Sequence, residues 1–134
     1  MMYLNDMLDL VRGLSLVEDG HLYMGKLDGK KERSIGVYNS KHEKAFKTAI
    51  GGPACESYGM KYVSLLVHGS RSIRDTEHLA AALFEKLRNV REMRVNEVTI
   101  KFIQLLTNGP VDVGTDDAGI CEMVMEAAVV YAKK

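Results

Sequence analysis

The pentapeptide His68-Gly69-Ser70-Arg71-Ser72 is the first place in the sequence where side chains could carry out chemistry. An imidazole beside a hydroxyl group can act as the general base for a serine nucleophile. The pentapeptide lacks the flanking glycines of the sharp turn that exposes a catalytic serine, and adjacency in sequence is not the geometry of a triad. The end of a strand followed by a helix cap explains the same residues more simply.

The residues that could bind zinc are scattered along the chain. They are His21, His42, His68, His78, Cys55 and Cys121. Zinc sites place such ligands in closely spaced pairs, and the sequence contains no such pair. We therefore expect no zinc site, and two cysteines so far apart favour reduced thiols in the cytosol rather than a secreted protein.

Two glycine-containing stretches have the composition of binding loops without the required ligands. Residues 112–119 hold three aspartates and two glycines but lack the ordered oxygen ligands and closing glutamate of an EF-hand, so we interpret them as an acidic turn leading into an edge strand. Gly51-Gly52-Pro53 lacks the following Lys-Ser or Lys-Thr of a phosphate loop and is interpreted as a hinge. The sequence predicts neither a metal ion nor a cofactor.

Residues 41–47 contain three lysines and one phenylalanine, which allows two interpretations. The lysines could contact phosphates while Phe46 stacks on a base, but one aromatic residue and the acidic Glu43 make this a weak nucleic-acid signal. Alternatively, the segment is a flexible arm that orders against an acidic patch on a neighbouring copy of the chain. The residues of this hypothetical partner interface are Lys41, Lys44, Phe46 and Lys47 on one copy and Asp112, Asp116 and Asp117 on the next.

The composition is that of an ordinary globular chain of 134 residues, 46% of them hydrophobic and 27% charged. Eighteen acidic and 18 basic residues cancel, which argues against a dedicated nucleic-acid-binding protein. No window reaches the roughly 18 apolar residues of a membrane span. The cancellation hides a segregation, because residues 26–47 hold seven bases and three acids whereas residues 108–126 hold five acids and no base. Such charge blocks can set the register between subunits.

The spacing of apolar residues predicts the elements that position these side chains. They are an amphipathic helix over residues 4–14, a hairpin of 21–27 and 34–39, a central strand over 60–68, a helix that is capped by Asp75 or Thr76 and ends near Val90, and a strand over 98–106. Together they indicate an α+β domain with helices packed on a sheet, and we expect a single domain over residues 1–134.

Two segments do not follow one clear period. Residues 40–59 lack a repeating apolar pattern, which indicates a long mobile loop at about 40–59. Residues 119–134 fit a strand and a helix almost equally well, because apolar residues alternate along them while methionine, alanine and glutamate favour helices.

On these residues alone, two other classes of function stay open. A small cytosolic α+β enzyme or ligand-binding regulator would use His68, Ser70 and the loop around Cys55 as a pocket. A nucleic-acid module would use residues 26–47, and its DNA binding would depend strongly on salt.

Three segments between Lys61 and Tyr131 carry a likeness to a known family. They are the strand Tyr62 to Val67 with its Gly-Ser-Arg end, the alanine-rich helix Ala80 to Leu87, and the Val-Gly-Thr-Asp-Asp-Ala-Gly-Ile turn from Val113 to Ile120. With the amino-terminal helix, this layout resembles the tail terminator, or tail-to-head joining, proteins of long-tailed bacteriophages (siphophages).

The resemblance implies a mixed, mainly antiparallel sheet with two helices packed on it, and a strand for the last segment. It implies a structural virion protein, not an enzyme, that caps the tail tube as a homohexameric ring, ends tube polymerisation and forms the interface for head-to-tail joining. The implied partners are further copies of the chain, the tail tube protein and the head-completion (stopper or connector) protein. No membrane and no specific nucleic acid are implied, although DNA can pass through such a ring. The implied location is the head-proximal end of the virion tail, and the host cytoplasm during assembly.

Overall fold

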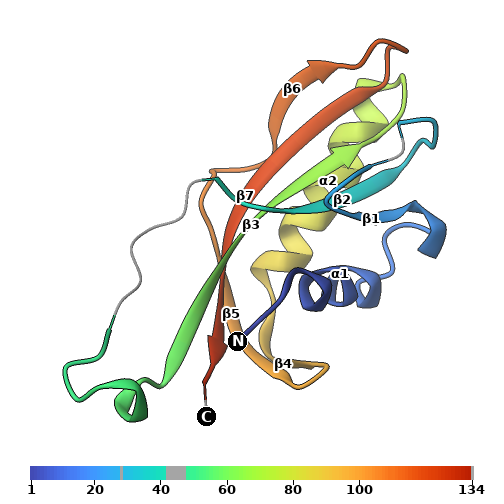
Figure 1. Ribbon diagram of the computed structural model, residues 1–134. Coiled ribbons are helices and arrows are strands. Elements are labelled where there is room, and N and C mark those ends of the chain that lie inside the picture. Colours follow the sequence, from blue (N-terminus) through green and yellow to red (C-terminus); the bar gives the residue numbers. More distant parts are fainter. Residues whose placement is uncertain (28, 42–47, 134) are drawn as a thin grey trace.

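Within the described residues 1–27, 29–41 and 48–133 of the computed structural model, seven strands form one sheet, and the helices lie on one of its faces (Figure 1). The strand order is β1-β2-β3-β7-β5-β4, and β6 pairs with β7 beyond the end of β5. This confirms the α+β class with a mixed, mainly antiparallel sheet. The helices and strands are α1 (Leu4–Gly13), β1 (Leu22–Met24), β2 (Ser34–Asn39), β3 (Tyr58–His68), α2 (Ile73–Arg88), β4 (Arg91–Val95), β5 (Val98–Leu105), β6 (Val111–Thr115) and β7 (Cys121–Ala132), with short 3-10 turns η1 (Asp19–His21) and η2 (Pro53–Cys55).

The longest strand, β7, lies at the centre of the sheet. One edge of β7 pairs with β3 along its whole length, from Tyr58 opposite Ala132 to His68 opposite Glu122. The other edge pairs first with β6 and then with β5. The strand implied by the family resemblance for the last segment is therefore confirmed. The expected edge strand after the acidic turn is wrong, because both edges of β7 are occupied.

The hydrophobic core lies between the inner face of the sheet and the two helices. Alternate residues of β3 and β7, together with one stripe of each helix, contribute apolar side chains that are at most 4% exposed. They include Val63, Leu65, Val67, Met125, Ala127, Val129, Met7, Leu10, Leu79, Leu83 and Leu87. Burying a leucine or valine side chain stabilises the fold by about 1.5–3 kcal/mol. The helices cover this face, whereas the opposite, outer face of β3, β7 and β5 is buried at Ala128 and Val130 and partly exposed at Phe102.

The first two strands are parallel, so the hairpin predicted for 21–27 and 34–39 is wrong. Leu22 lies opposite Ile35, and the chain between the strands runs back alongside η1 before β2 begins. Gly25 starts this return in the left-handed region, with φ of 78°, and its N–H donates to Val37 O at 2.8 Å. Alternation of apolar residues shows which face of a strand is buried but not its direction, and this return segment sets the direction.

The ends of several elements differ from the prediction. Helix α2 begins at Ile73 and is capped by Ser72, whose hydroxyl accepts from the N–H of Asp75 at 3.3 Å, so the predicted cap at Asp75 or Thr76 is wrong. In the loop expected over 40–59, residues 53–55 form η2 and β3 already begins at Tyr58. Strands β4 and β6 were not predicted. Residues 42–47 lie outside the described part of the chain.

Candidate interaction surfaces

Two of the three aspartates proposed for the partner interface accept backbone hydrogen bonds, Asp116 in the turn between β6 and β7 and Asp112 within β6. Asp116 Oδ1 accepts two backbone N–H groups of the turn, both at 2.9 Å. Asp112 Oδ1 accepts from the N–H of Gly114 at 2.8 Å, at the bulge where the register between β6 and β7 shifts. Asp112 and Asp117 are exposed. Residues 111–122, here called the acidic hairpin, thus form an ordered projection with carboxylates facing solvent.

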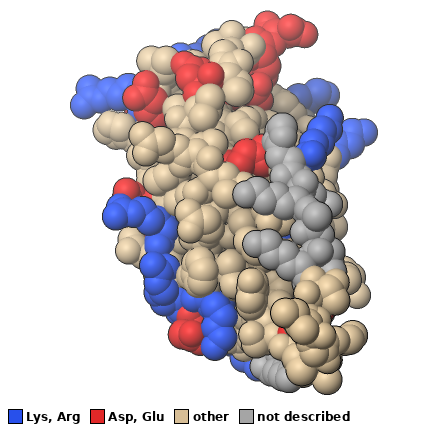
Figure 2. Space-filling model, turned by 90° about the vertical axis from the view of Figure 1, so that its left-hand side faces the viewer, with Lys and Arg blue, Asp and Glu red and all other residues tan. Residues whose placement is uncertain are grey.

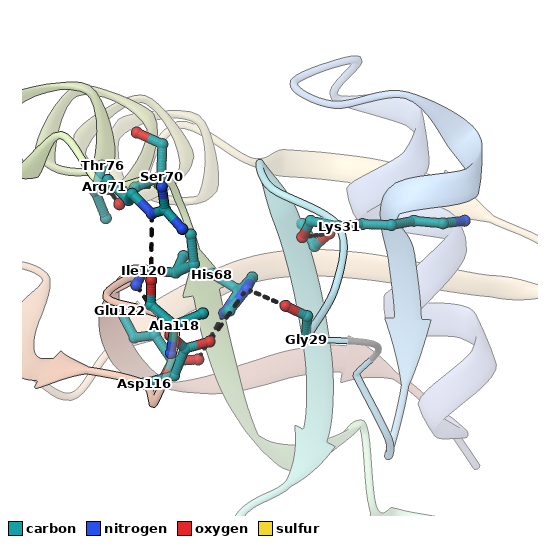
Figure 3. Close-up of polar contacts among 11 residues, drawn as sticks. Gly29, Lys31, His68, Ser70, Arg71, Thr76, Asp116, Ala118, Ile120 and Glu122 are labelled. Atoms are coloured by element: carbon teal, nitrogen blue, oxygen red, sulfur yellow. Dashed lines mark hydrogen bonds and ion pairs between the residues drawn. The ribbon is translucent and has the colours of Figure 1, made fainter.

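His68 is buried beneath the acidic hairpin and contacts three oxygen atoms (Figure 3). Its side chain is 1% exposed, with Nδ1 2.8 Å from Glu122 Oε2 and Nε2 3.1 Å from the carbonyl oxygen of Gly29. Asp116 Oδ2 lies 3.8 Å from Nε2. A carboxylate and a carbonyl both accept hydrogen bonds, so each ring nitrogen faces an oxygen that can accept one. The ring therefore binds the β1–β2 return, the end of β3 and the start of β7 together.

Tyr38 of β2 lies near the same carboxylate. Burial raises the pKa of the Tyr38 phenol, the N–H of Leu27 opposes this effect, and the negative charge of Glu122 adds to it. The Tyr38 phenol is therefore neutral at physiological pH.

The connection from β3 to α2 holds the acidic hairpin from a second side. Arg71 Nε donates to the carbonyl oxygen of Ala118 at 3.2 Å (Figure 3). The backbone N–H of Cys121 donates to Ser70 O at 2.8 Å, and that of Gly69 donates to Cys121 O at 3.0 Å. The Gly-Ser-Arg tract that supported the family resemblance is therefore a support for the acidic hairpin.

The pocket proposed for an enzyme or ligand-binding regulator is not assembled. The Ser70 hydroxyl accepts from the N–H of Ser72 at 3.1 Å and donates to its carbonyl at 3.4 Å, whereas His68 directs its nitrogens to Glu122 and Gly29. Cys55 is exposed in η2, before the start of β3, and His68 is the last residue of that strand. The three proposed pocket residues therefore do not meet.

Of the four residues proposed on the basic loop, the structure describes only Lys41, which is exposed. The others lie outside the described residues: Lys44, Phe46 and Lys47. Lys41 follows Ser40, whose hydroxyl donates to Glu126 Oε2 at 2.9 Å, while Ser64 donates to the other oxygen of Glu126 at 2.7 Å. The N–H of Ser40 donates to Tyr62 O, midway along β3, so this anchor does not lie at the end of β3 where the acidic hairpin joins. Lys41 and the acidic hairpin are therefore at different levels of the sheet within one copy.

The other end of the same loop is bound to the end of β7. Lys133 Nζ lies 2.7 Å from Glu56 Oε1, and the backbone N–H of Lys133 donates to Ser57 O at 3.1 Å. The hydrogen bond from Lys133 lowers the pKa of the Glu56 carboxyl. Both ends of the loop are thus fixed to the sheet, at Glu126 and at Lys133.

An open groove of about 560 Å³ runs along β5 where β4 ends. We call it the arginine groove, and it is lined by Phe84, Arg88, Arg91, Phe102, Ile103, Gln104, Leu105 and Asn108. The Arg91 guanidinium lies over the Phe102 ring, 6.0 Å from its centroid. Arg88 contacts Glu85 through Nη1. Sequence reasoning missed this groove because it depends on β4, which was not predicted.

On the surface seen from the left of Figure 1, the two kinds of charge are unevenly distributed, with basic side chains also on both upper sides (Figure 2). Acidic side chains gather at its upper end, where Figure 1 places the turn after β6, and basic side chains follow its lower left margin. The area between them is mainly uncharged. Across the outer face, Phe102 of β5 lies opposite Val130 of β7, which lies opposite Met60 of β3. Phe102 is 39% exposed.

Comparison with known proteins decides the family. A family model described as bacteriophage tail terminator protein matches residues 10–133, nearly the whole chain. The chain belongs to this family. A search of the curated proteins gives no match. The tail terminator family is a family of virion structural proteins, so this chain has a structural role in the phage tail, as the resemblance implied.

Among the residues that the structure describes, no helix is long and apolar enough to cross a membrane. The same residues contain no group of three or more His, Cys, Asp or Glu side chains arranged to hold a metal ion.

Proposed function

We propose that this tail terminator caps the tail tube as a hexameric ring, ends tube polymerisation and presents the interface for head-to-tail joining. The observation that carries the proposal is the family match over residues 10–133. The partners are then further copies of the chain, the tail tube protein and the head-completion protein, without a membrane or a specific nucleic acid. The location is the head-proximal end of the virion tail, reached from the host cytoplasm, and DNA passes through the ring.

The geometry favours an assembly role over catalysis. The pocket expected for an enzyme or regulator is not formed, whereas exposed apolar side chains and segregated charges lie on surfaces that the helices leave open. Such features give contacts that are weak individually but set the position of one subunit relative to the next. In a closed ring, several of these contacts act together, which strengthens the assembly. We propose that the protein has no catalytic activity.

The loop and the acidic hairpin are the proposed contact between neighbouring copies. Lys41, the residue of this loop that the structure describes, is exposed, and so are Asp112 and Asp117, which leaves them accessible to a neighbouring copy. In this proposal Lys41, Lys44, Phe46 and Lys47 face Asp112, Asp116 and Asp117 of the neighbour.

The experiment is to assemble phage tails with this protein omitted. Tubes of uncontrolled length and unjoined heads are expected, and adding the purified protein should restore defined tubes with rings at their ends in electron micrographs. Tubes of normal length that join heads without the protein would refute the proposal. A shift in melting temperature caused by small metabolites, with no effect on tails, would favour the enzyme or regulator instead.

A further inference from the structure

The free edge of β5 in the arginine groove is an unfilled position in the sheet. Strand β4 pairs with β5 only from Val98 to Phe102, whereas β7 pairs with β5 as far as Leu105. Residues 103–105 therefore have β7 on one side and, among the described residues, no strand on the other. An exposed sheet edge of this kind can accept an extended segment from another chain.

The side chains around this edge specify which segment fits. Phe84 and Phe102 offer apolar surface on either side of the edge, and Arg88 and Arg91 supply positive charge. Arginine and aromatic side chains are the residues that most often dominate protein interfaces. The matching segment is extended, alternates apolar side chains with carboxylates, and is itself exposed.

Strand β6 has these properties. All five of its residues are exposed, with Val111 at 47% and Val113 at 55% exposure, and the exposed Asp112 stands between them. One edge of β6 pairs with β7, and the acidic turn that follows adds the exposed Asp117. The turn is ordered by its own hydrogen bonds, so little conformational freedom would be lost on binding.

We propose that the arginine groove of one copy binds β6 of a second copy, with its apolar side chains on the aromatic surface of the groove and its carboxylates near Arg88 and Arg91. The two surfaces differ, so the contact is heterologous, the kind that closes into a ring when the rotation between copies allows it. The inference rests on the proposed ring and names an ordered contact within it. Gln104 of the groove shares a transverse row of the sheet with Ala128 and Tyr62, the residue that binds Ser40, so the groove and Lys41 lie at the same level of the sheet with β7 and β3 between them.

A charge-swap experiment on tail tubes assembled without this protein tests the inference. One variant carries Arg88→Glu and Arg91→Glu, the other carries Asp112→Lys and Asp117→Lys, and both are first checked for wild-type melting temperature. Each variant alone opposes like charges at every contact, so the fraction of tubes with a ring should fall about tenfold or more. In an equal mixture, a ring in which the two variants alternate has opposite charges at every contact, and capping should recover. The control for the arginine variant is Lys26→Glu with Arg74→Glu, which lowers the net charge by the same amount on exposed residues outside the groove, and it should cap like the wild type.

A disulfide trap gives a second readout of the same contact. Gln104→Cys with Val113→Cys, in a Cys55→Ser background, should form a ladder of oligomers on oxidation when tubes are added. Single variants that cap like the wild type would overturn the inference while leaving the proposed function intact. Failure of the mixture to recover, when each variant alone is defective, would overturn the pairing of the groove with β6 while leaving the proposed function intact. Wild-type protein that never caps tubes would refute the proposed function itself.

Discussion

Replacing His68 by phenylalanine tests whether the buried imidazole binds three segments of the fold. The ring is 1% exposed and contacts Glu122 Oε2 at 2.8 Å and Gly29 O at 3.1 Å. The phenylalanine ring is flat and somewhat larger than imidazole, so the substitution removes both hydrogen bonds without leaving a cavity. It leaves the Glu122 carboxylate and the Gly29 carbonyl without their donor.

The expected loss follows from these two bonds. A hydrogen bond to a charged group contributes about 1.5–3 kcal/mol and a neutral one about 0.5–1.5 kcal/mol. The Glu122 side chain is 23% exposed and can recover part of its loss from water. We therefore expect His68→Phe to lower the free energy of unfolding by about 2–3 kcal/mol. For a domain of this size, that corresponds to a melting temperature lower by about 6–9 °C.

Urea unfolding followed by circular dichroism at neutral pH measures the free energy, with His78→Phe on the exposed face of α2 as the matched control. Amide hydrogen exchange should speed up in the β1–β2 return around Gly29 and remain unchanged in α1. A His68→Phe protein within 0.5 kcal/mol of the wild type would refute the reasoning, because the hydrogen bonds would then carry no net stability.

Three further predictions concern the turns and ends of the fold. Gly69→Ala should lower the free energy of unfolding by about 2 kcal/mol or more, measured by urea unfolding, because the added methyl would lie 2.1 Å from Oγ1 of the buried Thr76. Ser72→Ala removes the cap of α2 and should cost about 1 kcal/mol in the same assay; an unchanged midpoint would show that the cap is redundant. Lys133 depresses the pKa of Glu56 below its ordinary value of 4.5, so this stabilisation is complete above that value and is lost as the pH falls through the depressed pKa. The stability difference between wild type and Glu56→Gln should therefore shrink when melting temperatures are compared from pH 6 down to pH 3, and a difference independent of pH would contradict the assignment.

The elements with a buried face could be predicted from the sequence. Val63, Leu65 and Val67 alternate because one face of β3 enters the core, and Leu79, Leu83 and Leu87 share one stripe of α2. Strands β4 and β6 could not be found in this way. Their residues are almost all exposed, and each strand holds only two alternating apolar residues, Met93 and Val95 in β4 and Val111 and Val113 in β6, which is too short a pattern to predict a strand.

Two errors have a different physical origin. The parallel pairing of β1 and β2 depends on a return segment whose path is set by Gly25 and by the contact of Gly29 with His68, which no short-range pattern encodes. The start of α2 could have been found, because Ser72 and Asp75 have the spacing of a capping box. The aspartates of the candidate interface were visible as a cluster, but the arginine groove exists only once β4 has folded against β5.

The pairing of β7 also determines how the molecule responds to mechanical load. Strands β6 and β5 pair with the two ends of one edge of β7 and do not pair with each other. Strand β3 pairs with the opposite edge of β7 along its full length. A pull along the sheet between the acidic hairpin and the β4–β5 end therefore loads these ladders in shear. Many hydrogen bonds then resist together, whereas a pull across an edge strand would open them one after another.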